Sequence, residues 1–146
     1  MQPELILNFA AMGLSVIAAF FVGYVWYGPL FGKLWAREMG HPADFAPEPR
    51  EMMRGLALQI LGLVLMTYVL AHTSQIWRPS VWNAGADQAD WVYAAYSTFF
   101  TWIGFFIPVL LSNVAWEGKS WRLFALNAAY YAVILGLINT ILSHWR

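Results

Sequence analysis

The sequence contains no cysteine, and charged residues make up only 11% of its 146 residues. The absence of cysteine excludes disulfide bonds, thiolate nucleophiles, and the cysteine-based zinc and iron–sulfur sites. Soluble domains usually carry roughly 25% charged residues, so this chain does not resemble one. Eight basic residues balance eight acidic ones, and no basic surface points to nucleic acid as a partner.

The usual motifs of catalysis and of metal or phosphate binding are also missing. The sequence has no HExxH, no glycine-rich phosphate loop and no GxSxG. The histidines His41, His72 and His144 have no carboxylate at ligand spacing beside them. No titrating carboxylate lies within an apolar segment, as a proton-coupled antiporter would require. We therefore expect no enzyme activity, no catalytic residue, no metal and no cofactor.

Long apolar runs dominate the remaining sequence, which is 60% hydrophobic. A bilayer core of about 30 Å needs roughly 20 mostly apolar residues per helix. Four segments qualify, at about residues 5–27, 53–73, 91–115 and 121–143, and the charged residues lie outside or at the edges of them. "MQPELILN" has no basic region of a signal peptide, so the first segment should be retained. The prediction is an all-α, single transmembrane domain over residues 1–146 that spans the lipid bilayer as a four-helix bundle.

Basic residues are distributed unequally between the two sides of this bundle. Only Arg78 and Arg146 lie on the side of the termini. The first and third connections carry the other six, which are Lys33, Arg37, Arg50, Arg54, Lys119 and Arg122. Because basic residues are enriched on the cytoplasmic side, we expect both termini to face outward.

The connections contain recognisable helix stops and starts. In "AWEGKSW", Gly118 suits the left-handed position that ends a helix, and Ser120 suits the N-cap of the next. In "WYGPLFGKLW", Gly28 and Pro29 should end or bend the first helix. A short amphipathic helix should follow along the membrane, with aromatic side chains among the lipid headgroups.

Small residues at intervals of about four predict the helix contact faces, because they allow backbones to approach closely in a membrane. The rows are Ala11, Ser15, Ala19 and Gly23; Gly55, Gln59 and Gly62; Ser97, Thr101, Gly104, Pro108 and Ser112; and Ala128, Ala132, Gly136 and Thr140. Pro108 should kink the third helix. Trp102 lies within a span, where we expect it to fill a helix contact.

Amide side chains are the candidate polar groups within the membrane. They are Asn8, Gln59, Asn113, Asn127 and Asn139. An unpaired amide in hydrocarbon costs several kcal/mol, so each should find a partner. Bonding between helices satisfies this requirement, and a site for a polar solute is the alternative.

A short echo links two segments on the predicted cytoplasmic face. "GKLW" at residues 32–35 is similar to "GKSW" at residues 118–121. We predict that the two segments approach each other, whether through duplication or coincidence. The candidate residues of this face are Trp26, Lys33, Trp35, Glu117, Lys119 and Trp121.

Two motif blocks resemble a known family. "VGYVWYGPLFGKLWAREMG" is similar to the first-helix signature of the bacterial membrane proteins catalogued as domain of unknown function 1761. "WIGFFIPVLLSNVAWEGKSWRLFALNAAYYAVILGLI" is similar to the signature of its second half. The resemblance implies a four-span integral membrane protein, here a multi-pass protein of the bacterial inner (cytoplasmic) membrane. It implies no established activity, and no catalytic residue is carried over.

Three functions fit this sequence. The first is a non-enzymatic assembly protein, which self-associates or joins a larger membrane complex, as the rows of small residues suggest. The second is a channel or carrier for a small neutral or weakly polar solute, as the amides suggest. The third is an enzyme acting on lipid or quinone with Glu117, Lys119 or His41, which only the aromatic inner surface favours.

Overall fold

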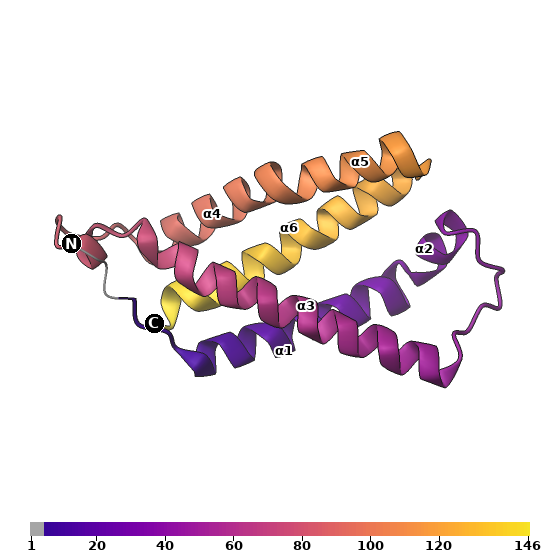
Figure 1. Cartoon of the computed structure of the whole chain (residues 1–146), viewed down its shortest axis with the longest axis horizontal. Coiled ribbons are helices and arrows are strands. Elements are labelled where there is room, and N and C mark those ends of the chain that lie inside the picture. The colour runs from indigo at the N-terminus through magenta and orange to yellow at the C-terminus, as the bar shows by residue number, and fades with distance from the viewer. Residues whose placement is uncertain (1–4) are drawn as a thin grey trace.

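The computed structural model describes residues 5–146, and this part of the chain is helical without strands (Figure 1). Four helical segments are long and apolar enough to cross a membrane: Phe9–Leu30, Pro49–Ile76, Asp90–Glu117 and Trp121–His144. These segments confirm the four predicted spans, with ends that differ by about four residues at most.

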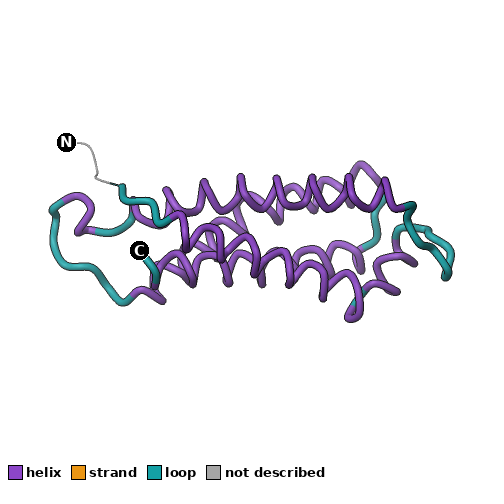
Figure 2. Tube along the Cα trace, turned by 90° about the horizontal axis from the view of Figure 1, so that it is seen from below, coloured by secondary structure: helices purple, strands orange, loops and turns teal. Residues whose placement is uncertain are grey.

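The elements follow in a simple order along the chain. They are α1 (Phe9–Val25), η1 (Trp26–Leu30), α2 (Gly32–Glu38), α3 (Pro49–Ile76), η2 (Pro79–Trp82), α4 (Asp90–Thr101), η3 (Trp102–Phe106), α5 (Ile107–Glu117) and α6 (Trp121–His144). The helices run side by side along the long axis, with the connections at its two ends (Figure 2). Following the predicted orientation, we call the end that carries the C-terminus the outer end and the opposite end the inner end.

Helix α6 lies at the centre of the bundle and contacts α1, α3, α4 and α5. Its side chains Ile134, Leu135 and Ile138 are fully buried. The facing side of α1 contributes small residues with no exposed surface, including Ala11 and Ala19. Small side chains allow the helix backbones to approach closely, which confirms the predicted contact face of the first span.

The tight turn between α5 and α6 confirms the sequence prediction. Gly118 adopts the left-handed conformation, with φ of 65°, and ends α5. The Ser120 hydroxyl oxygen accepts a hydrogen bond from the backbone N–H of Leu123 and caps α6. This turn makes α5 and α6 antiparallel neighbours (Figure 1).

Both odd-numbered spans contain a π-helical turn near a proline. The first, η1, includes Gly28 and Pro29, so the helix continues to Leu30 and breaks at Phe31. The second, η3, ends just before Pro108. A proline cannot donate its backbone hydrogen bond, and the wider turn accommodates this loss without ending the span. The first span therefore stops slightly later than Gly28 and Pro29 predict.

The inner half of α3 diverges from the bundle. Every residue from 49 to 62 is exposed, whereas the outer half of the same helix contributes Leu63, Leu70 and Ala71 to the core. A Cβ atom added at Gly55 or Gly62 would meet no atom within 4 Å. The prediction of a close helix contact face is therefore wrong for Gly55 and Gly62, because α3 leans away from its neighbours there. The longer side chain of Gln59 still reaches Tyr130 of α6 through a hydrogen bond.

Gly104, Pro108 and Ser112 of the third span are also exposed. Only the outer members of that predicted row, Ser97 and Thr101, are partly buried. Close helix contact through the third span is therefore concentrated in its outer half, where α4 packs on α6.

Candidate functional site

A groove lies between the inner halves of α3, α5 and α6, with a volume of about 550 Å³. We call it the inner groove. Its lining comes from four spans: Tyr27, Gln59, Phe105, Phe106, Val109, Leu110, Asn113, Asn127, Tyr130 and Tyr131. The volume is within the range of about 300–1,000 Å³ that is typical of small-molecule sites. The groove brings three of the five predicted amides together.

Two hydrogen bonds between spans organise the polar groups of the inner groove. The Tyr27 hydroxyl donates to Asn127 Oδ1 at 2.7 Å. Gln59 Nε2 donates to the Tyr130 hydroxyl oxygen at 3.2 Å. Within the described chain, the Asn113 side chain makes no hydrogen bond, although it lines the same groove. Gln59 and Asn127 therefore join helices, whereas the Asn113 side chain is available to bind a ligand.

Aromatic rings form a continuous wall beside these amides. The Phe106 and Tyr131 ring centroids are 4.4 Å apart, and those of Tyr131 and Tyr130 are 5.2 Å apart. Tyr130 in turn lies 4.9 Å from Tyr27, edge to face. Such arrangements stabilise aromatic pairs beyond their buried area. The wall gives the inner groove a rigid apolar side that faces its amides.

Local backbone features position this wall. A Cβ atom added at Gly23 would lie 2.9 Å from the Tyr130 hydroxyl oxygen, so glycine makes room for that hydroxyl beside α1. At Gly32, an added Cβ would lie 2.6 Å from the Tyr27 carbonyl oxygen. Glycine at position 32 therefore allows the start of α2 to pack closely against η1, the turn that carries Tyr27.

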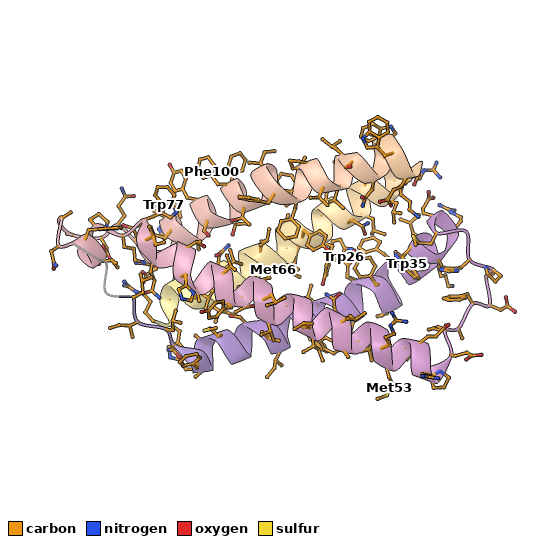
Figure 3. The ribbon with its side chains drawn as sticks, in the orientation of Figure 1. Trp26, Trp35, Met53, Met66, Trp77 and Phe100 are labelled. Carbon is orange, nitrogen blue, oxygen red and sulfur yellow. The ribbon has the colours of Figure 1, made fainter. Side chains whose placement is uncertain are left out.

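Trp26, at the inner end of the first span, is directed into the bundle. It packs against the buried core, near Phe31 and Tyr130, and its indole nitrogen is buried without a partner among the described residues. Figure 3 shows Trp26 directed into the bundle, whereas Met53 points away from the other helices. The π turn η1 begins at Trp26 and Tyr27 and presents both rings to the interior.

The two remaining candidate amides lie outside the inner groove. Asn139 is fully buried, accepts from the Ser97 hydroxyl at 3.0 Å and donates to Thr98 Oγ1 at 3.1 Å. It joins α6 to α4, as the helix-bonding interpretation predicted. Asn8 precedes the first span and caps α1, with its Oδ1 accepting from the Ala11 N–H at 3.0 Å. Contrary to the sequence prediction, Asn8 is therefore not an amide within a span. Its side chain accepts a hydrogen bond from a backbone N–H that would otherwise be unpaired at the start of α1.

The predicted approach of the two echoing segments is confirmed. Helix α2, which contains Lys33 and Trp35, contacts the start of α6. The Ser120 hydroxyl donates to Glu38 Oε2 at 2.6 Å, and Arg122 lies 3.9 Å from the same carboxylate. The short helix after the first span is therefore packed against the bundle at its inner end.

The other candidate residues of the inner face do not gather into one site. Lys33, Glu117 and Trp121 are exposed, and the Trp121 ring packs against Phe124 on its own helix. Lys119 is half-buried, and its backbone N–H donates to the Asn113 carbonyl oxygen. Trp35 packs against the Tyr27 ring at 6.5 Å and thereby extends the aromatic wall. Of the six residues, Trp26 and Trp35 are the two joined to the wall.

Trp102 donates its indole N–H to the Ala128 carbonyl oxygen at 2.8 Å, which confirms its predicted role in a helix contact. It also lines a second, largely apolar depression of about 400 Å³ between α4 and α6. That depression has a floor of small residues, including Ala132 and Gly136, and His144 stands at its outer end.

Sequence reasoning missed Arg78, the most buried charged side chain among residues 5–146. Arg78 retains only 1% of its side-chain exposure and lies 2.9 Å from Asp90 and 3.5 Å from Asp87. It also donates to the Ser143 carbonyl oxygen and stands over the Tyr93 ring at 4.2 Å. A single arginine in a loop is normally expected to be exposed. The two acidic residues that follow it, at positions 87 and 90, were the sequence signal that could have predicted a buried ion cluster.

Asp87 connects this cluster to the loop and to the C-terminus. It accepts from the Ser80 N–H and hydroxyl at 2.9 and 2.8 Å, and Arg146 lies 3.3 Å away. Partial desolvation raises the pKa of the Asp87 carboxyl, but these hydrogen bonds and the Arg146 and Arg78 charges outweigh it and leave the pKa below its ordinary value. The Asp87 carboxyl is therefore ionised at neutral pH.

The lining of the inner groove is suited to binding uncharged molecules. Among the described residues, its lining contains amides, phenols and apolar side chains, and no lysine, arginine, aspartate, glutamate or histidine. The described chain also contains no group of three histidines and carboxylates arranged to hold a metal ion. The inner groove can bind hydrogen-bonding, uncharged groups beside aromatic rings.

No match was found among curated proteins or among solved structures. A family model described as "Protein of unknown function (DUF1761)" matches residues 10–143, which is nearly the whole chain. The four apolar helices agree with the architecture that the resemblance implied. The chain is therefore an integral membrane protein of uncharacterised activity that belongs to the DUF1761 family.

Proposed function

We propose that this protein is a non-enzymatic membrane protein that binds a small neutral, weakly polar molecule in the inner groove, as a carrier would. One observation supports the proposal most strongly. Three intramembrane amides from three different spans converge with tyrosine hydroxyls on one open groove that contains no charged side chain among the described residues. In hydrocarbon, polar groups needed only for packing would be expected to pair completely.

The packing of the outer half favours a carrier over an open channel. There, Ser15, Thr67 and Asn139 are fully buried among the apolar core residues of α1, α3 and α6. A channel would need a wet path through this region. The inner groove does not extend through this outer half, as expected for a binding site that requires rearrangement before release on the other side.

Binding to purified protein in lipid nanodiscs tests this function. We expect the ¹⁹F signal of 4-fluoroacetophenone, a neutral ketone, to broaden more with the wild-type protein than with empty nanodiscs. Asn127→Leu should abolish the difference, because it removes an amide at the centre of the groove. Equal broadening with wild-type, Asn127→Leu and empty nanodiscs would reject the function, and Ser112→Ala on the exposed side of α5 serves as the matched control.

A second candidate, self-assembly, is favoured by a separate observation. The inner half of α3 exposes Gly55 and Gly62 to open space, and such small residues commonly mark helix contacts in membranes. The protein has no cysteine, so Gly55→Cys introduces a single thiol. Rapid formation of a disulfide-linked dimer in membranes treated with copper phenanthroline as the oxidant would support assembly through this face, and an exclusively monomeric product under the same conditions would contradict it.

The location in a bacterial inner membrane, with the inner groove near the cytoplasm, is part of the proposal. The structure supports it through charge, because helix α2 and the α5–α6 turn lie at the same end. These segments, together with the starts of α3 and α6, carry the six basic residues that predict a cytoplasmic face. Thiol labelling of single cysteines introduced at either end of the bundle tests this orientation.

A further inference from the structure

The hydrogen bonds within the inner groove use acceptor atoms and leave donors available. Asn127 Oδ1 accepts from Tyr27, so the amide nitrogen of Asn127 keeps its two N–H groups, which have no partner in the described chain. The Tyr130 oxygen accepts from Gln59, so the Tyr130 O–H is free to donate. Neutral amide and phenol groups in this state complement an acceptor such as a carbonyl oxygen.

The buried position of Tyr130 makes this arrangement selective. Tyr130 is only 2% exposed and is among the residues that line the inner groove, and its hydroxyl lies against Gly23. A buried donor without an acceptor is costly, whereas one paired with a ligand oxygen contributes to binding. A ligand without an acceptor would leave this donor unsatisfied, which is the usual basis of strong discrimination by polar sites.

The inner groove also has an apolar side that faces the membrane. Helix α5 contacts α6 and η3, and α3 contacts α1, α4 and α6, but no extensive contact joins α3 to α5 within residues 5–146. Phe105 and Val109 stand at this gap and are 72% and 62% exposed. On the opposite edge, α3 is exposed from residue 49 to residue 62. A molecule in the groove therefore has a lateral path into the lipid.

We propose that the ligand of the inner groove is a neutral amphiphile, with a carbonyl-type acceptor bound by Asn127 and Tyr130 and an apolar tail that leaves between α3 and α5. This inference rests on the proposed function and specifies its ligand class. The ring wall of Tyr27, Tyr130 and Tyr131 favours a flat head group beside the acceptor. The uncharged lining disfavours phosphate, carboxylate and ammonium head groups, whose desolvation nothing in the groove would offset.

Photolabelling tests this ligand class directly. The probe is 4-decylbenzophenone, a neutral ketone with an apolar tail that bonds covalently to nearby C–H groups when illuminated. In nanodiscs, we expect its adducts to concentrate on the groove residues of η3 and α5. Decanophenone, which has a carbonyl and a tail, should prevent labelling at about one-tenth of the concentration that decylbenzene, which lacks the carbonyl, requires.

Two variants separate recognition from folding. Asn113→Leu removes an amide that makes no hydrogen bond within the described chain, so the fold should persist while groove labelling declines several-fold. Asn127→Leu should abolish the advantage of decanophenone over decylbenzene. Ser112→Ala, on the neighbouring exposed position, should retain wild-type labelling and competition. Equal competition by decanophenone and decylbenzene in the wild-type protein would overturn the role of the carbonyl.

Two further results separate this inference from the proposed function. If acetophenone, which has no long tail, competes as well as decanophenone, then the groove binds neutral solutes but the amphiphile inference is wrong. If labelling spreads evenly over all lipid-facing helices and responds to no competitor or variant, both are wrong.

Discussion

The outer and inner halves of the bundle use polar side chains in opposite ways. In the outer half, Asn139 is enclosed by hydrogen bonds to α4, and Arg78 is enclosed by two aspartates and a backbone carbonyl. In the inner half, Asn113 and Asn127 line an open groove and retain free hydrogen-bonding capacity among the described residues. The difference indicates that the outer half stabilises the fold and that the inner half is available for binding.

The largest effect should come from Arg78→Met, which leaves Asp87 and Asp90 without their buried partner. Removing one member of a buried ion cluster typically costs about 3 kcal/mol, and we expect a loss of about that size in SDS-induced unfolding. Binding of 4-fluoroacetophenone to the folded fraction should be unchanged. The matched control is Arg146→Ala, at a half-exposed ion pair, which should cost less than about 1 kcal/mol. Similar losses for both variants would contradict the special role of Arg78.

Asn139→Ala should be the next most destabilising change. It removes two hydrogen bonds between α4 and α6 and leaves the Ser97 and Thr98 hydroxyls to find other partners. We expect a loss of about 2 kcal/mol in the same unfolding assay. Asn113→Ala, which breaks no hydrogen bond in the described chain, should change stability by less than about 0.5 kcal/mol. The comparison between halves fails if the inner amide proves as important for stability as the outer one.

Gly23→Ala should affect the inner groove more than the fold. The added methyl group would press on the Tyr130 hydroxyl and displace it from Gln59. We expect about 1 kcal/mol of destabilisation, near the lower limit for overpacked sites, because the end of a tyrosine side chain can shift. The free energy of 4-fluoroacetophenone binding should become weaker by at least the same amount. Gly13→Ala, on the same helix with open space around it, is the control, and its binding should equal that of wild type.

The smallest effect should be a pH dependence of the folding stability that arises from the Asp87 carboxyl. The pKa of Asp87 is lower in the folded protein than its ordinary value, so its ionised form stabilises the fold. This contribution is complete above the unfolded-state value of about 3.9 and declines as the pH falls through the folded-state pKa. Unfolding measured between pH 6 and pH 3 should show this decline. Asp87→Asn should have a flatter profile, and an identical profile would refute the assignment.

Periodicity and helix signals were sufficient to predict much of the fold. Apolar runs located the four spans, and Gly118 with Ser120 located the turn between α5 and α6. These features are local, because a span depends on its own length and polarity and a cap on its own backbone. The row from Ala11 to Gly23 also correctly identified the buried face of α1.

The candidate site was only partly predictable for the same reason. The sequence identified Gln59, Asn113 and Asn127 as polar residues within spans, but nothing local showed that they meet. A similar row of small residues packs in α1 and remains exposed in the inner half of α3. The spacing of small residues permits helix contact without requiring it, and the divergence of α3 is decided by how all four helices pack.

The sequence by itself determined the four membrane spans, because each of its four long apolar runs has the length and low charge that a bilayer-crossing helix requires. Only the tertiary structure decided which polar groups are enclosed and which are available. Arg78 is buried because Asp87 and Asp90 converge on it from the other end of the same loop. Asn127 and Tyr130 face an open groove because α3 and α5 separate at the inner end.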